Sequence, residues 1–168
     1  DKGIGGLRSD LQEKLKEQPD NNFYKAGIQC LDIFVDCASH LQQDAREQMA
    51  SANMKRQKEL ERICQALENI KEKKPGTFHE AMQLFWLFAL LAGVINYGRL
   101  DDYLGPYLVA DLKSGRLTDE EAYRYIHSLW TMIENRRTTV NGRIIVGGKG
   151  RKHPKEADVF LHLSLIHI

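Results

Sequence analysis

The sequence predicts a mainly helical chain with one short β-hairpin near its C-terminal end. Apolar residues recur at spacings of three and four over most of the chain, which is typical of amphipathic helices. Two Thr-x-x-Glu patterns stand where helices would begin. One Asn-Gly pair separates two β-branched runs, which is a strong hairpin signal.

The length and composition are those of an ordinary globular chain. It has 168 residues, a formal net charge of +1, 42% hydrophobic residues and 28% charged residues. A charge so near zero argues against a dedicated nucleic-acid binder, which carries a basic excess. The sequence shows no secretory signal pattern and no apolar run of about 20 residues that could span a membrane. We therefore expect a cytoplasmic protein that binds neither nucleic acid nor membrane.

Three amphipathic helices are expected in the first part of the chain. Leucines repeat every four residues over 7–15, and Pro19 ends that helix. A second helix is expected over about residues 23–49 and a third over about residues 55–70, because apolar residues recur there at spacings of three and four. Each of these helices would bury one face.

The middle of the chain contains its most apolar segment. Thr77 and Glu80 form a capping-box pattern, and residues 84–95 carry no polar side chain. Twelve residues are too few to span a bilayer, which needs about 20. A helix that is apolar on all sides must be surrounded by protein, and 168 residues offer few layers to surround it. We therefore expect this helix at the centre of a larger protein structure.

The second half of the chain is expected to begin with two more helices. Residues 96–99 should break the apolar helix, and a short helix should follow to about Leu112 with Gly115 as its C-cap. A second capping box at residues 118–121 should start a helix that runs to about Ile133.

The hairpin and a last apolar segment follow. Residues 138–140 and 144–146 are β-branched and flank the Asn-Gly pair at 141–142. Residues 147–152 predict a flexible basic loop, and residues 157–168 form the final apolar segment.

Several motifs fail on inspection of their spacing. His79 and Glu80 begin like a zinc-protease HExxH, but Gln83 stands where the second histidine must be, so no zinc site is expected. The glycines near Lys149 resemble a phosphate loop, but Gly150 stands where the magnesium-binding hydroxyl should be. The small basic cluster is expected to be a solvated loop, and it comprises Lys149, Arg151, Lys152 and His153.

The cysteine count favours free thiols. Cys30, Cys37 and Cys64 are an odd number with no CxxC pair, so a disulfide framework is not expected. Buried apolar thiols are the simpler interpretation, and a reactive or metal-binding role is the alternative. Spacing alone identifies no catalytic set and no metal-ligand set anywhere in the sequence.

Short motifs in a fixed order nevertheless resemble glycyl radical enzymes, the pyruvate formate-lyase-like family. Residues 75–86 resemble its P-x-T-F-x-E-A-x-Q-x-x-W segment, and residues 98–104 resemble GR-x-D-x-Y-L. Residues 111–122 resemble DL-x-x-G-x-(I/L)-T-x-EEA, and residues 2–7 and 145–148 resemble two further segments. Each motif is weak alone, but the ordered set covers nearly the whole chain.

The resemblance sets the expected domain boundaries. Residues 1–162 should be part of a pyruvate formate-lyase-like domain. Residues 163–168 look like a non-native tail, similar to translated sequencing adapter, and the true gene should continue differently from there.

The resemblance implies a fold and a chemistry. The implied fold is a ten-stranded α/β barrel wrapped by helices, of which this chain would be a mainly helical part. In the implied mechanism, a radical-SAM activase with an iron–sulfur cluster installs a radical on a glycine, and a cysteine thiyl radical then attacks a small-molecule substrate. Such lyases, dehydratases and acyltransferases cleave C–C, C–O or C–N bonds. The family implies a homodimer in an anaerobic cytoplasm.

The sequence lacks the family's catalytic cysteine loop and its glycyl motif R-V-(S/A)-G-Y, so we interpret it as an internal fragment that is inactive alone. In the family, the break after the apolar helix lies near the substrate chamber. Candidate substrate-binding residues are therefore Asn96, Tyr97, Arg99 and Asp101. A buried structural ion pair between Arg99 and Asp101 is the simpler alternative. A second hypothesis for the whole chain is a non-enzymatic helical scaffold or interaction module.

Overall fold

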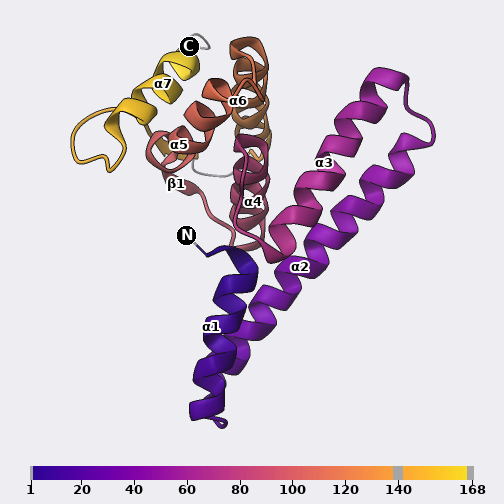
Figure 1. Ribbon diagram of the computed structural model, residues 1–168, viewed down its shortest axis with the longest axis vertical. Coiled ribbons are helices and arrows are strands. Elements are labelled where there is room, and N and C mark those ends of the chain that lie inside the picture. The colour runs from indigo at the N-terminus through magenta and orange to yellow at the C-terminus, as the bar shows by residue number, and fades with distance from the viewer. Residues whose placement is uncertain (1, 138–141, 166–168) are drawn as a thin grey trace. The chain divides into compact units, whose positions relative to one another are not determined.

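A computed structural model describes residues 2–137 and 142–165 (Figure 1). The elements in chain order are α1 Gly3–Glu17, α2 Asn22–Met49, α3 Met54–Glu72, α4 Phe78–Leu91, β1 Asn96–Arg99, α5 Leu100–Lys113, α6 Asp119–Asn135, β2 Arg143–Ile145 and α7 Pro154–Leu165. The prediction of a mainly helical chain is confirmed. The chain divides into two compact units, residues 1–75 with 83–88, and residues 76–82 with 89–168.

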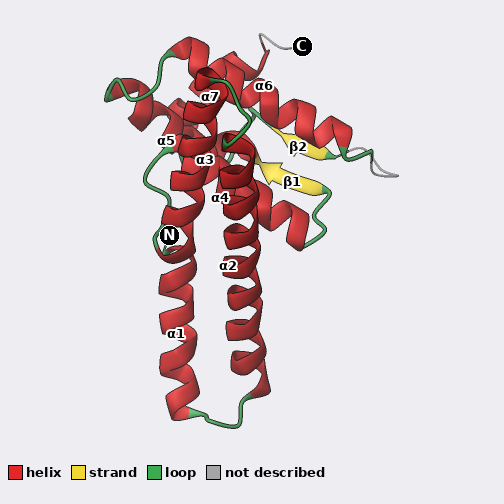
Figure 2. Cartoon of the chain, turned by 90° about the vertical axis from the view of Figure 1, so that its right-hand side faces the viewer, coloured by secondary structure: helices red, strands yellow, loops and turns green. Residues whose placement is uncertain are grey.

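The first unit is a set of antiparallel helices. Figure 2 shows α1 and α2 side by side, joined by the short turn at the lower end of the view, and Figure 1 shows α3 returning along α2. Asparagine caps start both longer helices: the side chain of Asn21 accepts from two amides of α2, and that of Asn53 accepts from one amide of α3.

Two apolar clusters hold this unit together. The larger one contains Ala38, Leu67, Ile70 and Leu87, with half-buried Phe34, Cys37, Ile63 and Leu84 around it. The smaller one contains Ala45, Leu60 and Cys64. Of the three thiols, Cys64 is buried as expected, but Cys37 is only partly buried and Cys30 is exposed on α2. The prediction of buried thiols is therefore wrong for Cys30.

Glycines allow α1 to touch the end of α3. A Cβ on Gly3 would lie 2.4 Å from the main-chain nitrogen of Lys74, and one on Gly5 would lie 2.3 Å from the carbonyl oxygen of Glu72. Gly3 also has a positive φ of 72°, which glycine adopts without the strain of a side chain. The glycines near the start of the chain are therefore packing residues.

The second unit packs α5, α6 and α7 around a core of its own. Its core contains two fully buried phenylalanines, Phe160 of α7 and Phe78 of α4. It also contains fully buried aliphatic side chains of α5 and α6, which are Leu100, Leu104, Leu108, Ile126 and Leu129. The rings of Phe78 and Phe160 lie edge to face with centroids 6.4 Å apart. A Cβ on Gly105 would lie 2.8 Å from the carbonyl of Glu156, so α5 and α7 cross at this glycine.

The apolar helix ends earlier than the sequence suggests. We predicted helix over residues 84–95, but α4 ends at Leu91. Gly93 has a φ of 62°; its N–H bonds to the Leu90 carbonyl and the N–H of Val94 bonds to the Ala89 carbonyl. This pair of bonds is a Schellman motif, which stops a helix whatever the hydropathy of the residues that follow.

Within residues 2–137 and 142–165, the apolar helix also keeps some of its apolar side chains exposed. Leu87 and Ala89 are buried, but Phe88, Leu90 and Leu91 are exposed. Within the described residues, no helix is long and apolar enough to cross a membrane.

The predicted hairpin is only partly found. β2 forms where the second β-branched run was expected, but it pairs in parallel with β1, with Gly98 opposite Ile144 and Arg99 opposite Ile145 (Figure 2). The first predicted strand, residues 138–140, and Asn141 lie outside the described residues. The segment that supplies β1 was expected to be only a helix break, because a four-residue Asn-Tyr-Gly-Arg run has no alternation of apolar and polar residues.

Candidate functional site

The four predicted substrate-binding residues lie where β1 meets α5. Asn96, Tyr97 and Arg99 belong to β1, and Asp101 lies in the first turn of α5. All four belong to the second unit, as do β2 and the loop that follows it. The structure therefore places them together around one strand–helix junction.

Tyr97 is a buried residue that is held at both ends. Its side chain accepts a hydrogen bond from Nη1 of Arg136 at 3.0 Å, and its carbonyl accepts one from the hydroxyl of Tyr103 at 2.6 Å. A Cβ on Gly142 would lie only 2.5 Å from Cε2 of the Tyr97 ring. Burial, reinforced by the negative charge of Asp101, raises the pKa of Tyr103, so this phenol stays protonated and can donate.

Arg136 extends this set to the end of α4. The same Nη1 donates to the carbonyl of Val94 at 2.6 Å and lies 3.4 Å from the carbonyl of Ala89. These carbonyls belong to the last turn of the helix and the residues just after it, which lack partners within the helix. Sequence reasoning missed Arg136 and Tyr103 as members of this site, although Tyr103 lies within the motif at residues 98–104.

Arg99 and Asp101 do not pair with each other among the described residues. Arg99 donates from Nη1 to the carbonyl of Gly147 at 3.2 Å and from Nη2 to the carbonyl of Lys149 at 2.9 Å. Asp101 is fully buried, accepts the N–H of Gly147 at 2.6 Å, and has Arg151 as its ion-pair partner at 3.7 Å. The alternative of an ion pair between Arg99 and Asp101 is therefore wrong. Both side chains contact the loop after β2, and Arg151 of that loop is the ion-pair partner of Asp101.

We name residues 147–153 the glycine loop. Asp102 holds its far end by accepting the N–H of His153 at 2.9 Å. This hydrogen bond is the main reason that the pKa of Asp102 lies below its ordinary value. Arg151 also forms an ion pair of 2.7 Å with Asp158 of α7. The loop that the sequence predicted to be flexible is thus held by several side chains.

Asn96 differs from the other three predicted residues. It is exposed, and its side-chain oxygen accepts the N–H of Gly98 at 3.3 Å. Among the four, Asn96 alone keeps its side chain at the surface of the part of the chain that is described.

The site contains no nucleophile and no metal-ligand cluster in its described part. No group of three or more His, Cys, Asp or Glu side chains that could hold a metal ion occurs within residues 2–137 and 142–165. The ring of His79 stacks on that of Tyr125 with centroids 4.9 Å apart. Glu80 accepts the N–H of Gly76 at 2.6 Å, while the N–H of Glu80 bonds to the Thr77 hydroxyl. The expected capping contact from Thr77 is confirmed, and Glu80 reaches one residue further back than expected.

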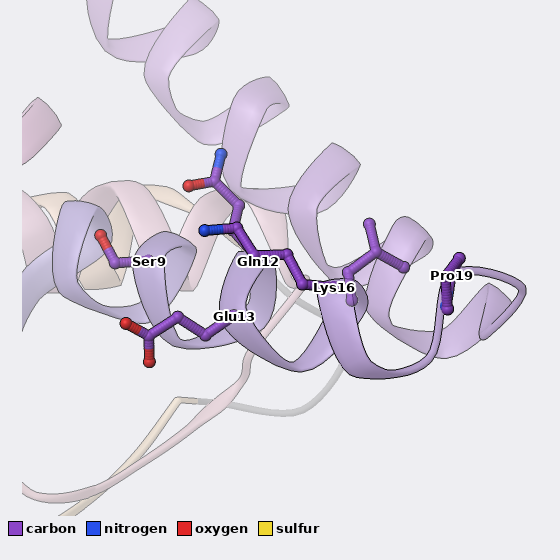
Figure 3. A pocket seen from close by; sticks show the side chains of 6 residues that line it. Ser9, Gln12, Glu13, Lys16 and Pro19 are labelled. Carbon is purple, nitrogen blue, oxygen red and sulfur yellow. The ribbon is translucent and has the colours of Figure 1, made fainter.

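A shallow hollow lies elsewhere, on the first unit. Figure 3 shows its lining side chains along α1 and the turn that follows: Ser9, Gln12, Glu13, Leu15, Lys16 and Pro19. All of these except Leu15 are exposed, and none comes from a second helix. This hollow is open surface and not a built site.

The family described as pyruvate formate lyase-like matches residues 1–159 of this chain. The chain therefore belongs to that family. Its relatives include the trans-4-hydroxy-L-proline dehydratase of Clostridioides difficile, 27% identical over 80% of this chain and 19% of the relative. An isethionate sulfite-lyase of Bilophila wadsworthia is 28% identical over 77% of this chain and 18% of the relative. The chain thus spans about a fifth of the length of the curated relatives it matches.

A solved structure shares the fold. The crystal structure of a glycyl radical enzyme from Archaeoglobus fulgidus matches 96% of this chain and 25% of that protein with a TM-score of 0.79 and 20% sequence identity. The mainly helical chain with its two parallel strands therefore has the fold of one part of a glycyl radical enzyme.

Proposed function

We propose that this chain is a segment of a glycyl radical enzyme that cleaves a bond of a small substrate by thiyl radical chemistry. The observation that carries the proposal is the family match over residues 1–159. The names of the relatives narrow the reaction class to dehydration or to release of sulfite, both of which are eliminations from a small molecule. Acyl transfer and other C–C or C–N bond chemistry have no such support.

The segment itself supplies structure to that enzyme. Its junction of β1, α5 and the glycine loop contains buried side chains that bond to the main chain, with Asn96 left at the surface. Such an arrangement can form part of a chamber wall, but it offers no group that attacks a substrate. Asn96 is the residue of this junction that we assign to substrate contact.

The residues of this chain do not fit the radical pair. Cys64 is buried, and its thiol lies 3.6 Å from the carbonyl of Gln42. Cys30 and Cys37 lie on the long helix α2, remote in sequence from every family-like motif near β1. The glycyl motif is absent from the sequence. In this proposal the cysteine and the radical glycine belong to a longer polypeptide, and this segment is inactive alone.

The proposed partners follow from the same assignment. They are a radical-SAM activase, a second copy of the longer polypeptide and a small substrate, in an anaerobic cytoplasm. The alternative, a non-enzymatic helical scaffold, becomes an outcome of the test below.

The test combines sequencing of the source DNA with electron paramagnetic resonance spectroscopy of the longer protein. The reading frame is extended beyond residue 162 at its source, and the longer product is activated without oxygen by a radical-SAM activase encoded nearby. We expect the electron paramagnetic resonance doublet of a glycyl radical. We also expect turnover of either trans-4-hydroxy-L-proline or isethionate, which product analysis would detect. The matched control is the 168-residue chain treated in the same way, which should give no radical signal.

A genuine stop after these residues, with no cysteine loop or glycyl motif in the neighbouring frames, would overturn the enzyme proposal in favour of the scaffold. A radical signal without turnover of either compound would keep the family chemistry and reject these two compounds as substrates.

A further inference from the structure

We propose that Arg99, Asp101 and Asp102 are positioning residues that hold the glycine loop in one conformation, so that Arg99 acts through this loop and not on a substrate. This proposal rests on the proposed function in one respect, namely that the loop forms part of the wall of the substrate chamber. Its test measures the loop itself, so the two can fail separately.

The three side chains bind the loop at its two ends and in its middle. Arg99 reaches the carbonyls of Gly147 and Lys149, and Asp101 and Asp102 accept the amides of Gly147 and His153. The chemistry is matched: a guanidinium presents a planar fork of donors to two carbonyls, and carboxylates accept two amides. Because the three residues lie within four positions of one another, one junction between β1 and α5 fixes seven loop residues.

The loop needs such anchors because its own sequence would not define it. Gly147, Gly148 and Gly150 all have positive φ angles, of 73°, 79° and 81°. Glycine reaches this region freely and loses more conformational entropy on ordering than any other residue. Gly148, Lys149 and Gly150 are also exposed, so apolar packing does not order them. The order must come from hydrogen bonds to the main chain.

Asp101 shows that the anchor is built into the core. It has no exposed surface, and a buried carboxylate is tolerated only when it is paired and hydrogen-bonded. Its Oδ2 contacts the amide of Gly147 and the guanidinium of Arg151, which both belong to the loop, while Oδ1 has no hydrogen-bond partner among the described residues. Arg151 in turn reaches Asp158 of α7. Burial of Asp101 is therefore stable only while the loop is in place.

The same geometry ties both terminal nitrogens of Arg99 to the loop. Both terminal nitrogens of its guanidinium already donate to loop carbonyls. A substrate anion that took these two N–H groups would deprive the loop carbonyls of their charge-assisted partners.

Trypsin provides a direct test, because the loop contains the cleavable residues Lys149, Arg151 and Lys152. In the 168-residue chain we expect slow cleavage after these residues, compared with a free peptide of residues 147–153. Arg99→Lys keeps the charge but replaces the fork by a single point donor, so cleavage there should accelerate by about tenfold. The matched control is Arg124→Lys, because Arg124 is an exposed arginine of α6 whose side chain makes no hydrogen bond to the loop in the part of the chain that the structure describes.

A second pair of variants separates the loop contact from the effect of an acid in a first helical turn. Asp102 lies in the first turn of α5 and Asp119 in the first turn of α6, but only Asp102 accepts a loop amide. Asp102→Asn should speed hydrogen exchange of the His153 amide by about tenfold and shift its proton resonance, and Asp119→Asn should do neither. Asp102 is half-buried, so this variant should fold even where a change of Asp101 does not.

Equal cleavage in the wild type and in Arg99→Lys would overturn the proposal. So would acceleration at every trypsin site in the chain, because the arginine would then support the whole unit and not the loop. Wild-type cleavage as fast as that of the free peptide would show that the loop is not held. Failure of the radical test would leave these results unchanged.

Discussion

Asp111 caps a helix that begins at Phe78, 33 residues before it. Its Oδ2 accepts the N–H of Phe78, the first residue of α4, at 2.8 Å, while its Oδ1 accepts from Nε of Arg116 at 2.9 Å and Nη2 at 2.8 Å. Asp111 is buried, so its bond to Phe78 is shielded from water, whereas the Arg116 side chain is 53% exposed. Two residues of the family-like motif at residues 111–122 therefore have different structural roles. Asp111 caps the start of α4, and Gly115, with a φ of 72°, ends α5.

Replacing Asp111 by Ala should destabilise the chain by about 2 kcal/mol, because a helix cap and a buried partner of Arg116 are lost together. Urea unfolding followed by circular dichroism measures this change. The control is Asp36→Ala, since Asp36 is an exposed aspartate of α2 whose side chain has no hydrogen-bond or ion-pair partner within residues 2–137 and 142–165. A loss of less than about 0.5 kcal/mol would show that the cap is dispensable.

Gly5→Ala should destabilise the chain, although alanine is the better helix former by about 1 kcal/mol. The new Cβ would meet the main-chain oxygen of Glu72, which cannot move without shifting α3. Gly27→Ala is the matched control, because its Cβ would meet only Cδ1 of Leu11, the far end of a flexible side chain. We expect the melting temperature to fall for Gly5→Ala and to stay equal or rise for Gly27→Ala. The reverse order would contradict the close approach of α1 and α3.

Gln42 joins α2 to α3 through a buried polar network. Its amide nitrogen donates to the carbonyl of Cys64 at 2.9 Å and to Glu68 at 3.0 Å, and its oxygen accepts from Lys71 at 2.9 Å. Gln42→Met keeps the size of the side chain but leaves Lys71 without this acceptor, and should cost about 2 kcal/mol of unfolding free energy. Gln43→Met is the control, because Gln43 is exposed and its side chain bonds to another exposed side chain, that of Glu47. Equal effects in denaturant unfolding would argue against the network.

Glu68 should make stability depend on acid pH. The hydrogen bond from Lys71, followed by the one from Gln42, lowers the pKa of Glu68 below its ordinary value of 4.5. A lowered folded-state pKa means that the stabilisation is fully present above that ordinary value and is lost as the pH falls through the lowered one. The melting-temperature difference between wild type and Glu68→Gln should therefore be constant from pH 8 to about pH 5 and shrink below.

The size of this effect should be small, because Glu68 is more than half exposed and solvent screens such pairs. Glu61→Gln, which removes an exposed acid from the same helix, corrects for the general effect of one charge. A difference between wild type and Glu68→Gln that grows on acidification would have the wrong sign.

The isolated chain should self-associate through its uncovered apolar helix. Phe88 is 52% exposed, Leu90 43% and Leu91 42%, and exposed apolar side chains of this size favour association. Leu90→Lys should reduce the association seen by sedimentation velocity at rising concentration. Leu7→Lys should not, because Leu7 is an exposed leucine of α1 in a polar stretch. A monodisperse, cooperatively melting wild-type monomer would contradict this expectation.

Much of the candidate site was predictable as a location but not as a set of contacts. The motif at residues 98–104 identified the right junction, because Arg99, Asp101 and Tyr103 all lie there and make specific bonds. The partner of Asp101 was not predictable, since Arg151 lies 50 positions away and no local spacing relates the two. Arg136 was missed because it bonds to main-chain carbonyl groups of residues distant in sequence, and every residue has such a group, so no sequence pattern identifies them.

The sequence by itself determined most of the helices and some of their ends. Periodicity and capping patterns identified α1 to α6, whereas the segment of α7 was predicted only to be apolar; the Thr118 capping box formed as expected, and Gly115 ended α5, because these signals act over one or two turns of the backbone. Only the tertiary structure decided that residues 96–99 form a strand, that β2 pairs with it in parallel, and that the glycine loop is held. Those outcomes depend on hydrogen bonds between segments more than 40 residues apart, which local propensity does not encode.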